Sequence, residues 1–507
     1  MKIDINTQKK VKTLKNFWNH MHHHPTDCIE DDWGKEMLTK IAQDKVAQTV
    51  RIYTMFEDMV SMDEDGNLQY DFTLNDKRMD FMVEQGFNLF VGYNFIPPCI
   101  AVDPHQFSES ERYKDKKISN SYPRDYKLWE QVCREYTEHI VERYGIELVS
   151  TWRMQCFNEP DMTRYWVLDG IDTYDEKRAM VEYNKLYDHF AKGVKAVSSR
   201  ILIGGPSLAG KQGWLDSFFT HITKEKNYAT GEIGAPLDFF AIHTYGISMK
   251  GFKEGWEFTS RSTLDATFRY YETAKKYGLE DRELIVDEWG LASTGFRDKE
   301  ACPQFDFRNR EFYSAHFAKF ICDYVYENAP VSKVMMCVCG TYGLTTDFMG
   351  FRSFFTLNRF PKPIYNAYVL TAKLGTALVE CGESPEFMGV FPTTDTNGKI
   401  TIMTYYTDDD LDNVQEDKDI TLSINGIDGI YKMTKYCIDE THCNSYTKFK
   451  ELGSPYNPDQ WQREVIGQAG KVAPMEPPCG IVADGKYEID LNMTNDSMYL
   501  IELEPVK

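Results

Sequence analysis

Two short motifs in the sequence each place a glutamate at the end of an apolar run. The first is Phe157-Asn158-Glu159-Pro160, which directly follows Trp152–Cys156, and the second is Asp287-Glu288-Trp289-Gly290, which follows Leu284-Ile285-Val286. A carboxylic acid can donate or accept a proton, and an ionised carboxylate can attack an electrophilic carbon. Two glutamates brought into one cleft could divide these roles between them.

The elements around the motifs decide whether the two glutamates can meet. From about residue 15 to residue 345, short apolar runs alternate with long helical patterns, which is the rhythm of repeated strand–helix units. The spacing predicts helices over Tyr126–Tyr144, Lys177–Val197, Ser262–Tyr277 and Glu311–Glu327. Eight strands are predicted over Leu14–His20, Val46–Tyr53, Asn88–Phe95, Leu148–Phe157, Ile201–Gly205, Leu237–Tyr245, Leu284–Glu288 and Val334–Cys339.

Eight strands with helical crossovers indicate a (β/α)8 barrel, although a doubly wound sheet has the same rhythm. No G-x-G-x-x-G or P-loop motif follows an early strand, which argues against a nucleotide-binding sheet. In the barrel, Glu159 ends the fourth strand and Glu288 ends the seventh. Both side chains would then point into the face where barrel enzymes carry out their chemistry.

Such a pair of glutamates suits hydrolysis of a glycosidic bond. Enzymes that retain the anomeric configuration place two carboxyl groups about 5–5.5 Å apart. Glu288 would attack the anomeric carbon, while Glu159 would donate a proton and later activate water, so the pKa of Glu159 is expected to be raised while Glu288 is ionised. Asn158 is placed to donate to the sugar 2-hydroxyl. Either motif alone is weak evidence, since a glutamate at a strand end is usually a surface residue.

Taken together, these motifs resemble glycoside hydrolase family 39, the retaining barrel enzymes that include β-xylosidases and α-L-iduronidases. The resemblance implies that Glu159 is the acid/base and Glu288 the nucleophile of a β-D-xylosidase-like enzyme that cleaves terminal bonds of oligosaccharides. It covers nearly the whole chain and is carried by Trp152–Asp161, Tyr165-Trp166, Lys195-Ala196-Val197, Ile203–Pro206, Pro236–Tyr245, the Glu288 strand and Phe360–Pro363.

The resemblance also implies roles for residues near the two glutamates. His243 would contact the sugar, Tyr245 would hydrogen-bond and orient Glu288, and Arg51 would help to keep Glu288 ionised. Considered alone, each of these could equally be a buried and satisfied polar residue. The further candidates for substrate contact are Tyr53, His22, His24, Trp289 and Trp166, of which the two tryptophans could wall the cleft.

Three strands depart from the β-xylosidase pattern, which indicates a rebuilt sugar site. Arg51-Ile52-Tyr53-Thr54 stands where those enzymes have R-G-H-G, and Met335–Cys339 lacks the tryptophan that ends strand eight. His20–Pro25 replaces a glycine-rich turn after strand one. An α-L-arabinosidase or a disaccharide-releasing specificity therefore stands beside a β-D-xyloside as the expected activity.

The histidine cluster His20–His24 also permits a metal hypothesis. H-x-H after strand one opens the metal site of amidohydrolase barrels, so His20 and His22 could serve a metal-dependent hydrolase. Such sites need histidines on strands five and six and an aspartate on strand eight, but Ile201–Ser207 has no histidine and strand eight has no aspartate. We therefore expect His22 and His24 at the mouth of a substrate cleft, with no metal and no other cofactor.

Composition narrows the partners that the protein is expected to have. The 507 residues carry a net charge of −21 without a Lys/Arg-rich run, which argues against nucleic acid or an anionic membrane surface. No stretch approaches 18 apolar residues, and the chain starts without a signal-peptide pattern. The 12 scattered cysteines suit free thiols in a reducing compartment. We expect a cytoplasmic homo-oligomer that acts on an oligosaccharide or a small glycoside.

The character of the sequence changes after about residue 370. Short alternating strands replace helical patterns, and Asn397-Gly398 between two of them is a strong hairpin signal. We expect a β-sandwich that also takes the first strand of the chain, with Lys2–Asn6 and Met498–Glu504 in one sheet. The expected domains are a strand over 1–13, a barrel over 14–370 and a sandwich over 371–507.

Overall fold

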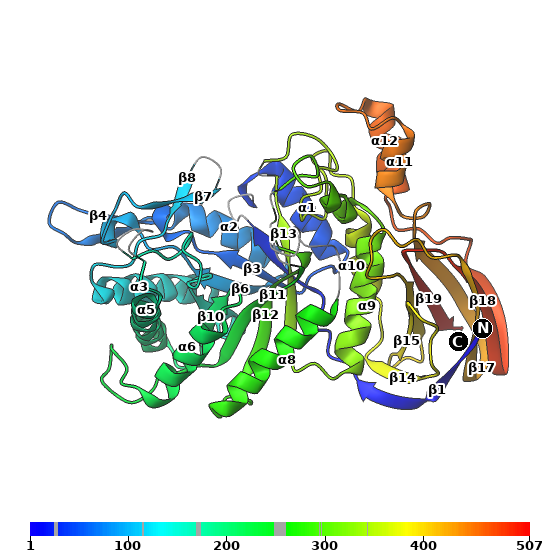
Figure 1. Ribbon diagram of the computed structural model, residues 1–507, viewed down its shortest axis with the longest axis horizontal. Helices are drawn as coiled ribbons and strands as arrows, with labels where there is room; N and C mark the ends of the chain where they lie inside the picture. Colours follow the sequence, from blue (N-terminus) through cyan, green and yellow to red (C-terminus); the bar gives the residue numbers. More distant parts are fainter. Residues whose placement is uncertain are drawn as a thin grey trace.

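The computed structural model describes residues 1–24, 29–113, 116–168, 174–247, 260–293, 295, 297–341 and 343–506. Within these residues, eight parallel strands close into a barrel and seven other strands form a separate sheet beside it (Figure 1). The predicted fold, an α/β barrel with a β-rich second part, is confirmed. None of the helices in the described part of the chain is both long and apolar enough to cross a membrane.

The barrel strands follow one another in chain order around the ring. Each predicted strand overlaps one of them, and side chains from four strands fill the interior as a small apolar cluster (Phe90, Phe239, Ala241, Ile285 and Met335). The strands are β2 (His20–His24), β3 (Thr49–Tyr53), β6 (Asn88–Tyr93), β9 (Arg153–Cys156), β10 (Leu202–Leu208), β11 (Phe239–Ile247), β12 (Glu283–Ala292) and β13 (Lys333–Cys339).

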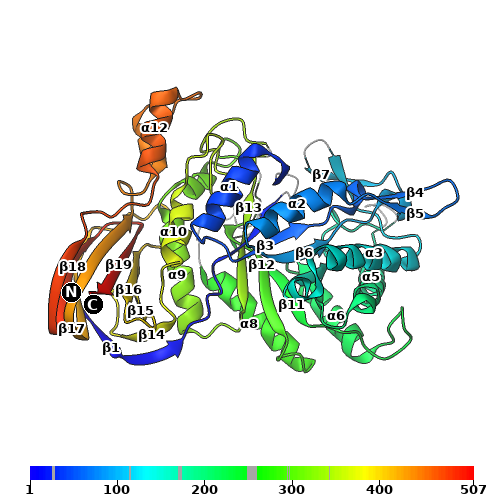
Figure 2. The same ribbon diagram turned by 180° about the vertical axis from the view of Figure 1, so that it is seen from behind.

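Helices surround this barrel in both views (Figures 1 and 2). In α3, Val132, Tyr136 and Ile140 are buried at the predicted spacing, and the Asp125 side chain accepts a hydrogen bond from the Lys127 amide at the helix start. The helices are α1 (Asp32–Gln43), α2 (Thr73–Glu84), α3 (Tyr126–Tyr144), α4 (Ile146–Val149), α5 (Glu176–Val197), α6 (Gln212–Lys224), α8 (Ser260–Lys276), α9 (Phe312–Tyr326) and α10 (Pro363–Thr371).

Short elements lie in the connections. They are the strand pairs β4 (Val60–Met62) with β5 (Leu68–Tyr70) and β7 (Phe107–Tyr113) with β8 (Lys116–Ser119), and 3-10 turns at Phe56–Asp58, Pro98–Ile100 and Pro303–Asn309.

The first barrel strand begins later than predicted. The apolar run from Leu14 does not form the strand, because a turn precedes His20: the Asn16 side chain accepts a hydrogen bond from the Asn19 amide at 3.1 Å. Asn19 in turn donates to the carbonyl of Val46 at 3.1 Å. The strand is therefore the histidine cluster itself, and not the segment before it.

The second sheet joins both ends of the chain. Residues 2–6 of β1 (Lys2–Thr13) run parallel to residues 421–425 of β17 (Lys418–Ile438), whereas residues 431–438 of β17 pair with β19 (Ser497–Pro505). The sheet thus curves back on itself, and the N and C marks lie together in Figure 1. The other strands are β14 (Ala377–Cys381), β15 (Met388–Thr394), β16 (Ile400–Tyr406) and β18 (Cys479–Met493).

The β15–β16 hairpin turns at Gly398, where φ is +83°, so the Asn-Gly prediction is confirmed. The domain limits at residues 13 and 370 stay a prediction. Two helices in this part of the chain, α11 (Ser445–Glu451) and α12 (Gln460–Ala469), were not predicted. They project from the sheet in both views, and Ile466 of α12 packs with Phe348 and Phe360 from the connection after β13.

Candidate active site

An irregularity in β12 positions the second glutamate. Ile242 pairs with Val286 and His243 pairs with Glu288, so Asp287 is an extra residue between these pairs, a β-bulge. A regular strand would turn one of two neighbouring side chains outward. Here both acids face inward, since both Asp287 and Glu288 contact Arg51, which projects into the barrel from β3 (3.2 and 2.8 Å).

The Glu288 carboxylate is held through both of its oxygens. Arg51 Nη1 donates to Oε1 at 2.8 Å, and Tyr245 Oη donates to Oε2 at 2.7 Å. His22 Nδ1 lies 3.1 Å from Oε1, and Tyr53 Oη lies 3.4 Å from the same oxygen. The residues predicted around the nucleophile therefore do surround Glu288.

These neighbours keep Glu288 ionised. Burial alone would raise the pKa of Glu288, but the charge of His243, the hydrogen bond of His22 and the charge of Arg51 hold this pKa well below its ordinary value. An ionised carboxylate that is fixed in orientation is suited to attack carbon.

Arg51 links this carboxylate to Asn158. The guanidinium is fully buried and donates to Gln155 Oε1 at 2.9 Å and to Asn158 Oδ1 at 2.7 Å. The Asn158 Nδ2 group has no hydrogen-bond partner among the described residues. The side-chain amide of Asn158 is therefore available to donate a hydrogen bond. The predicted contact with a sugar hydroxyl requires such a donor.

Glu159 lies on a constrained turn after β9. Phe157 and Glu159 have φ of +63° and +43°, in the left-handed region that non-glycine residues rarely adopt. The Glu159 amide donates to the Ser207 carbonyl at 3.0 Å, and the Asp161 carboxylate accepts the amides of Ala209 and Gly210. The turn is therefore tied to the end of β10, which fixes the direction of the Glu159 side chain.

The two glutamates meet at His243. His243 Nδ1 lies 2.8 Å from Glu159 Oε1 and 3.7 Å from Glu288 Oε2. One carboxylate oxygen of each glutamate and a ring nitrogen of His243 all lie within 4.8 Å of one another. This spacing is close to the about 5–5.5 Å of retaining glycosidases and is too small for the about 6.5–9.5 Å that inverting enzymes need for a water.

The charge of Glu288 raises the pKa of Glu159, as predicted, but the net pKa of Glu159 in the free protein is lowered. Burial raises this pKa, but the charge of Arg164 and the hydrogen bond and charge of His243 outweigh burial and lower it. Arg164 Nη2 lies 3.0 Å from Glu159 Oε2. His243, in turn, has its pKa raised to about 10 by the surrounding carboxylates in spite of burial. The free site thus holds its proton on His243.

The histidine cluster was predicted at the mouth of a cleft, but it lies inside the barrel. His22 is fully buried against Glu288, and its ring stands 4.9 Å from that of Tyr53. His24 is also buried, with its ring 5.8 Å from Tyr53 and 5.4 Å from His22. Burial lowers the pKa of His24 to about 3 and that of His22 well below its usual value, so both rings are neutral.

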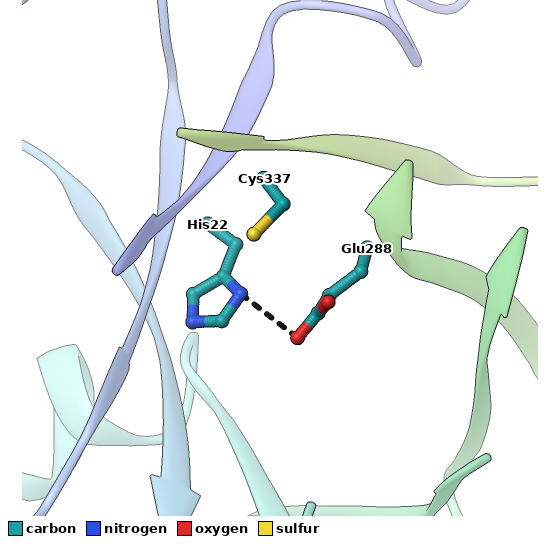
Figure 3. Close-up of side chains that lie close together, drawn as sticks. All are labelled: His22, Glu288 and Cys337. Carbon is teal, nitrogen blue, oxygen red and sulfur yellow. Dashed lines mark ion pairs between the residues drawn. The ribbon is translucent and has the colours of Figure 1, made fainter. Parts of the chain in front are cut away.

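His22, Glu288 and Cys337 converge closely enough to suggest a metal site, with one ligand atom of each within 4.8 Å of the others (Figure 3). The surrounding charges oppose this, because the guanidinium of Arg51 bonds to Glu288 and that of Arg352 donates to Cys337 Sγ at 3.1 Å. Burial also raises the pKa of the Cys337 thiol well above its ordinary value, which disfavours the thiolate that metals bind. These donors do not fit a resident divalent metal.

His20 does not extend that cluster. Its Nε2 lies 3.2 Å from the carbonyl of Asn16, at the opposite end of β2 from His24. The amidohydrolase pattern of His20 with His22 is therefore not formed.

The two tryptophans were predicted to wall the cleft, but they do not. Trp289 is buried against α9, with its ring centre 4.4 Å from that of Phe320. Trp166 packs on Phe157 at 5.1 Å and donates to the Ala179 carbonyl. Trp289 lies behind the barrel strands because the residue after the bulge turns outward toward the helices. Trp166 lies in the connection after β9, against the start of α5.

Sequence reasoning missed three residues that the structure brings to the site: Asp287, Arg164 and Arg352. Asp287 is part of the second motif. In a regular strand, however, neighbouring side chains point to opposite faces, so Asp287 would point out of the barrel. Arg352 lies in the long connection after β13, where no periodic pattern places it. Its guanidinium covers the Tyr245 ring at 4.9 Å, and its Nε and Nη1 have no hydrogen-bond partner among the described residues.

Comparison with known proteins finds relatives of this chain in sequence and in fold. A β-xylosidase of Caldicellulosiruptor saccharolyticus is 24% identical, over 99% of this chain and 98% of the relative. An α-L-iduronidase of Canis lupus familiaris is 22% identical over 48% of this chain and 35% of the relative. The structure of a monomeric β-xylosidase from Caulobacter crescentus shares the fold with a TM-score of 0.81, at 18% identity and full coverage of both chains.

The sequence model described as glycosyl hydrolases family 39 matches residues 1–486, nearly the whole chain. The resemblance found from the motifs is thereby confirmed. A match of this extent, on a barrel that gathers two glutamates within 4.8 Å, leads to one assignment. The chain belongs to glycosyl hydrolase family 39 and is a glycoside hydrolase.

Proposed function

We propose that this enzyme is a retaining exo-glycosidase that works by double displacement. Glu288 attacks the anomeric carbon, and the leaving oxygen takes a proton from Glu159 as its bond to carbon breaks. Water then attacks the same carbon and gives a proton to Glu159, while the bond from the carbon to Glu288 breaks. The observation that carries the proposal is the spacing of the two carboxylates, within 4.8 Å by their oxygens.

The residues around the pair support this division of roles. Glu288 pairs with Arg51 and accepts a hydrogen bond from Tyr245. Glu159 pairs with Arg164 and shares the neighbouring His243 Nδ1 with Glu288. Asn158 would donate to the sugar 2-hydroxyl, where a hydrogen bond strengthens in the transition state. The buried rings of His22, His24 and Tyr53 would contact the sugar beside the nucleophile.

For the sugar, we propose a β-D-xylosidase-like specificity as the nominal activity, in line with the names of the full-length relatives. α-L-Arabinosidase activity and release of a disaccharide remain rival specificities. They are supported by Cys337 on β13 and the histidines of β2, which build this sugar site from side chains unlike those of the β-xylosidase pattern.

A second candidate is a glycoside of a uronic acid, and Arg352 is the observation that favours it. Arg352, Arg308 and Lys362 are buried together, and their hydrogen bonds go to backbone carbonyls or a thiol. Burial and then the charge of Arg352 lower the pKa of Arg308 to about 9. A sugar carboxylate at the open edge of Arg352 would relieve this crowding, and some relatives are named α-L-iduronidase.

The test is the initial rate on a panel of nitrophenyl glycosides beside Glu159→Ala and Glu288→Ala. The panel covers β-D-xyloside, both α-L-arabinosides, β-D-glucoside, β-D-galactoside, β-D-glucuronide and α-L-iduronide. We expect Glu288→Ala to be inactive, and azide to rescue Glu159→Ala with formation of a glycosyl azide of retained configuration. Activity that survives both substitutions would refute the assignment.

We also propose a cytoplasmic, homo-oligomeric enzyme. The 11 cysteines in the described part of the chain are all free thiols, which suits a reducing compartment. Sedimentation velocity tests the oligomeric part, and a single species of 58.9 kDa would refute it.

A further inference from the structure

Both oxygens of the Glu159 carboxylate are occupied in the free protein. His243 Nδ1 lies 2.8 Å from Oε1, and Arg164 Nη2 lies 3.0 Å from Oε2. A general acid must turn one protonated oxygen toward the leaving group of the substrate. Two cations beside the carboxylate oppose its protonation, so withdrawal of one of them favours the protonated form that the first chemical step needs.

The two partners differ in how deeply their side chains are buried. The His243 side chain is fully buried between the glutamates, whereas the Arg164 side chain is 40% exposed. Arg164 follows Glu159 by five residues on the same turn, and its guanidinium lies over the ring of Tyr165 at 5.0 Å. Tyr165 is itself stacked on Phe95 at 5.8 Å, so the ring offers a fixed support beside the carboxylate. Of the two cations, Arg164 is the one whose side chain reaches solvent.

We propose that Arg164 is a positioning residue that pairs with Glu159 whenever this carboxylate is ionised, and yields Oε2 to the leaving oxygen of the substrate. The inference rests on the proposed function, because it takes Glu159 as the acid/base. It deepens that function by assigning the control of the acid/base to a residue outside the buried core.

The departure and return of Arg164 would match the protons that Glu159 gains and loses during the reaction. When a substrate displaces Arg164, Glu159 loses a neighbouring cation and takes up a proton from solvent, which it passes to the leaving oxygen as the glycosidic bond breaks. The departure of the aglycone frees the space, and Arg164 pairs again with the ionised Glu159. The carboxylate is then ready to accept the proton of the attacking water.

The other charged groups around Glu159 remain when Arg164 is removed. Asp161 lies on the same turn, His243 comes from β11, and Asp287 and Glu288 come from β12. An adjacent arginine lowers a carboxyl pKa by about 1–3 units. Because Arg164 is partly exposed, its removal should raise the pKa of Glu159 by about one unit, the low end of this range.

The experiment measures kcat/KM against pH for wild type, Arg164→Met and Arg164→Lys, on the nitrophenyl glycoside that the panel turns over fastest. The alkaline limb of kcat/KM reports the acid/base of the free enzyme. We expect this limb to move up by about one pH unit in Arg164→Met and to stay near wild type in Arg164→Lys. Arg200→Met is the matched control, since it removes a half-exposed ion pair with Glu147 on the surface.

A second measurement does not depend on turnover. The 13C signal of the Glu159 carboxyl, identified by its loss in Glu159→Gln protein, is titrated in wild type and Arg164→Met. A change in rate with both limbs unmoved, or a Glu159 pKa within 0.2 units of wild type, would overturn the inference. Failure of azide to rescue Glu159→Ala would instead show that the acid/base assignment itself is at fault.

Discussion

The hydroxyl of Tyr245 offers a direct perturbation of Glu288, the proposed nucleophile. Tyr245 Oη donates to Glu288 Oε2 at 2.7 Å, while Arg51 holds Oε1 from the other side. Tyr245→Phe removes one oxygen atom and leaves the ring that supports the Arg352 guanidinium. The change therefore takes one donor from the carboxylate with little effect on packing.

The expected size follows from the strength of the bond. A hydrogen bond to a charged group contributes about 1.5–3 kcal/mol, and about 1.36 kcal/mol corresponds to one pKa unit. The pKa of Glu288 should rise by about 1–2 units. Because the ionised nucleophile is lost as pH falls through this pKa, the acid limb of kcat/KM should move up by the same amount. Loss of orientation should also lower the rate at the optimum, by up to about 100-fold.

Tyr53→Phe is the matched control. It removes the same group from the same carboxylate, but Tyr53 Oη lies 3.4 Å from Oε1, beyond the range of a strong hydrogen bond. We expect a shift of the acid limb of less than half a unit. Unfolding temperatures of both variants check the fold. The reasoning fails if Tyr245→Phe leaves the acid limb in place, or if Tyr53→Phe moves it as far.

Three other results are expected. Since the pKa of His243 is raised to about 10, its charged form stabilises the fold fully below pH 6.5 and less as pH rises toward 10. Calorimetry should therefore show an unfolding temperature that falls over this pH range. A fall of equal size in His243→Asn would contradict this. A chelator should leave the hydrolysis rate unchanged, and loss of activity that zinc or manganese restores would instead favour the metal-dependent alternative. If the substrate is a uronide, Arg352→Leu should lower kcat/KM on the uronide about 30-fold, because a hydrogen bond to a charged group contributes about 2 kcal/mol. Turnover of the xyloside should stay unchanged. An equal loss on both substrates would assign Arg352 a structural role.

The barrel was predictable because its elements carry strong local signals. Helix α3 begins and ends at Tyr126 and Tyr144, as its apolar spacing predicts. The two glutamates were predictable for a related reason, since a polar residue that directly follows a buried strand lies at the same end of the barrel as its counterparts.

Features that depend on tertiary contacts could not be read in this way. The bulge that turns Asp287 inward has no local sequence signal, and it also sends Trp289 toward α9. His22 lies on a strand and not in a loop, because the turn at Asn16 ends the preceding apolar run. The low pKa of Glu159 depends on Arg164, whose place beside the carboxylate is set by the turn that follows β9.

Trapping of the glycosyl-enzyme identifies the residue that attacks the anomeric carbon. The enzyme is incubated with the dinitrophenyl 2-deoxy-2-fluoro derivative of the sugar that the panel selects, and the labelled peptide is identified by mass spectrometry. We expect one label per chain, on Glu288, and none in Glu288→Ala. A label on another residue such as Asp287, or no label while the parent glycoside is turned over, would contradict it.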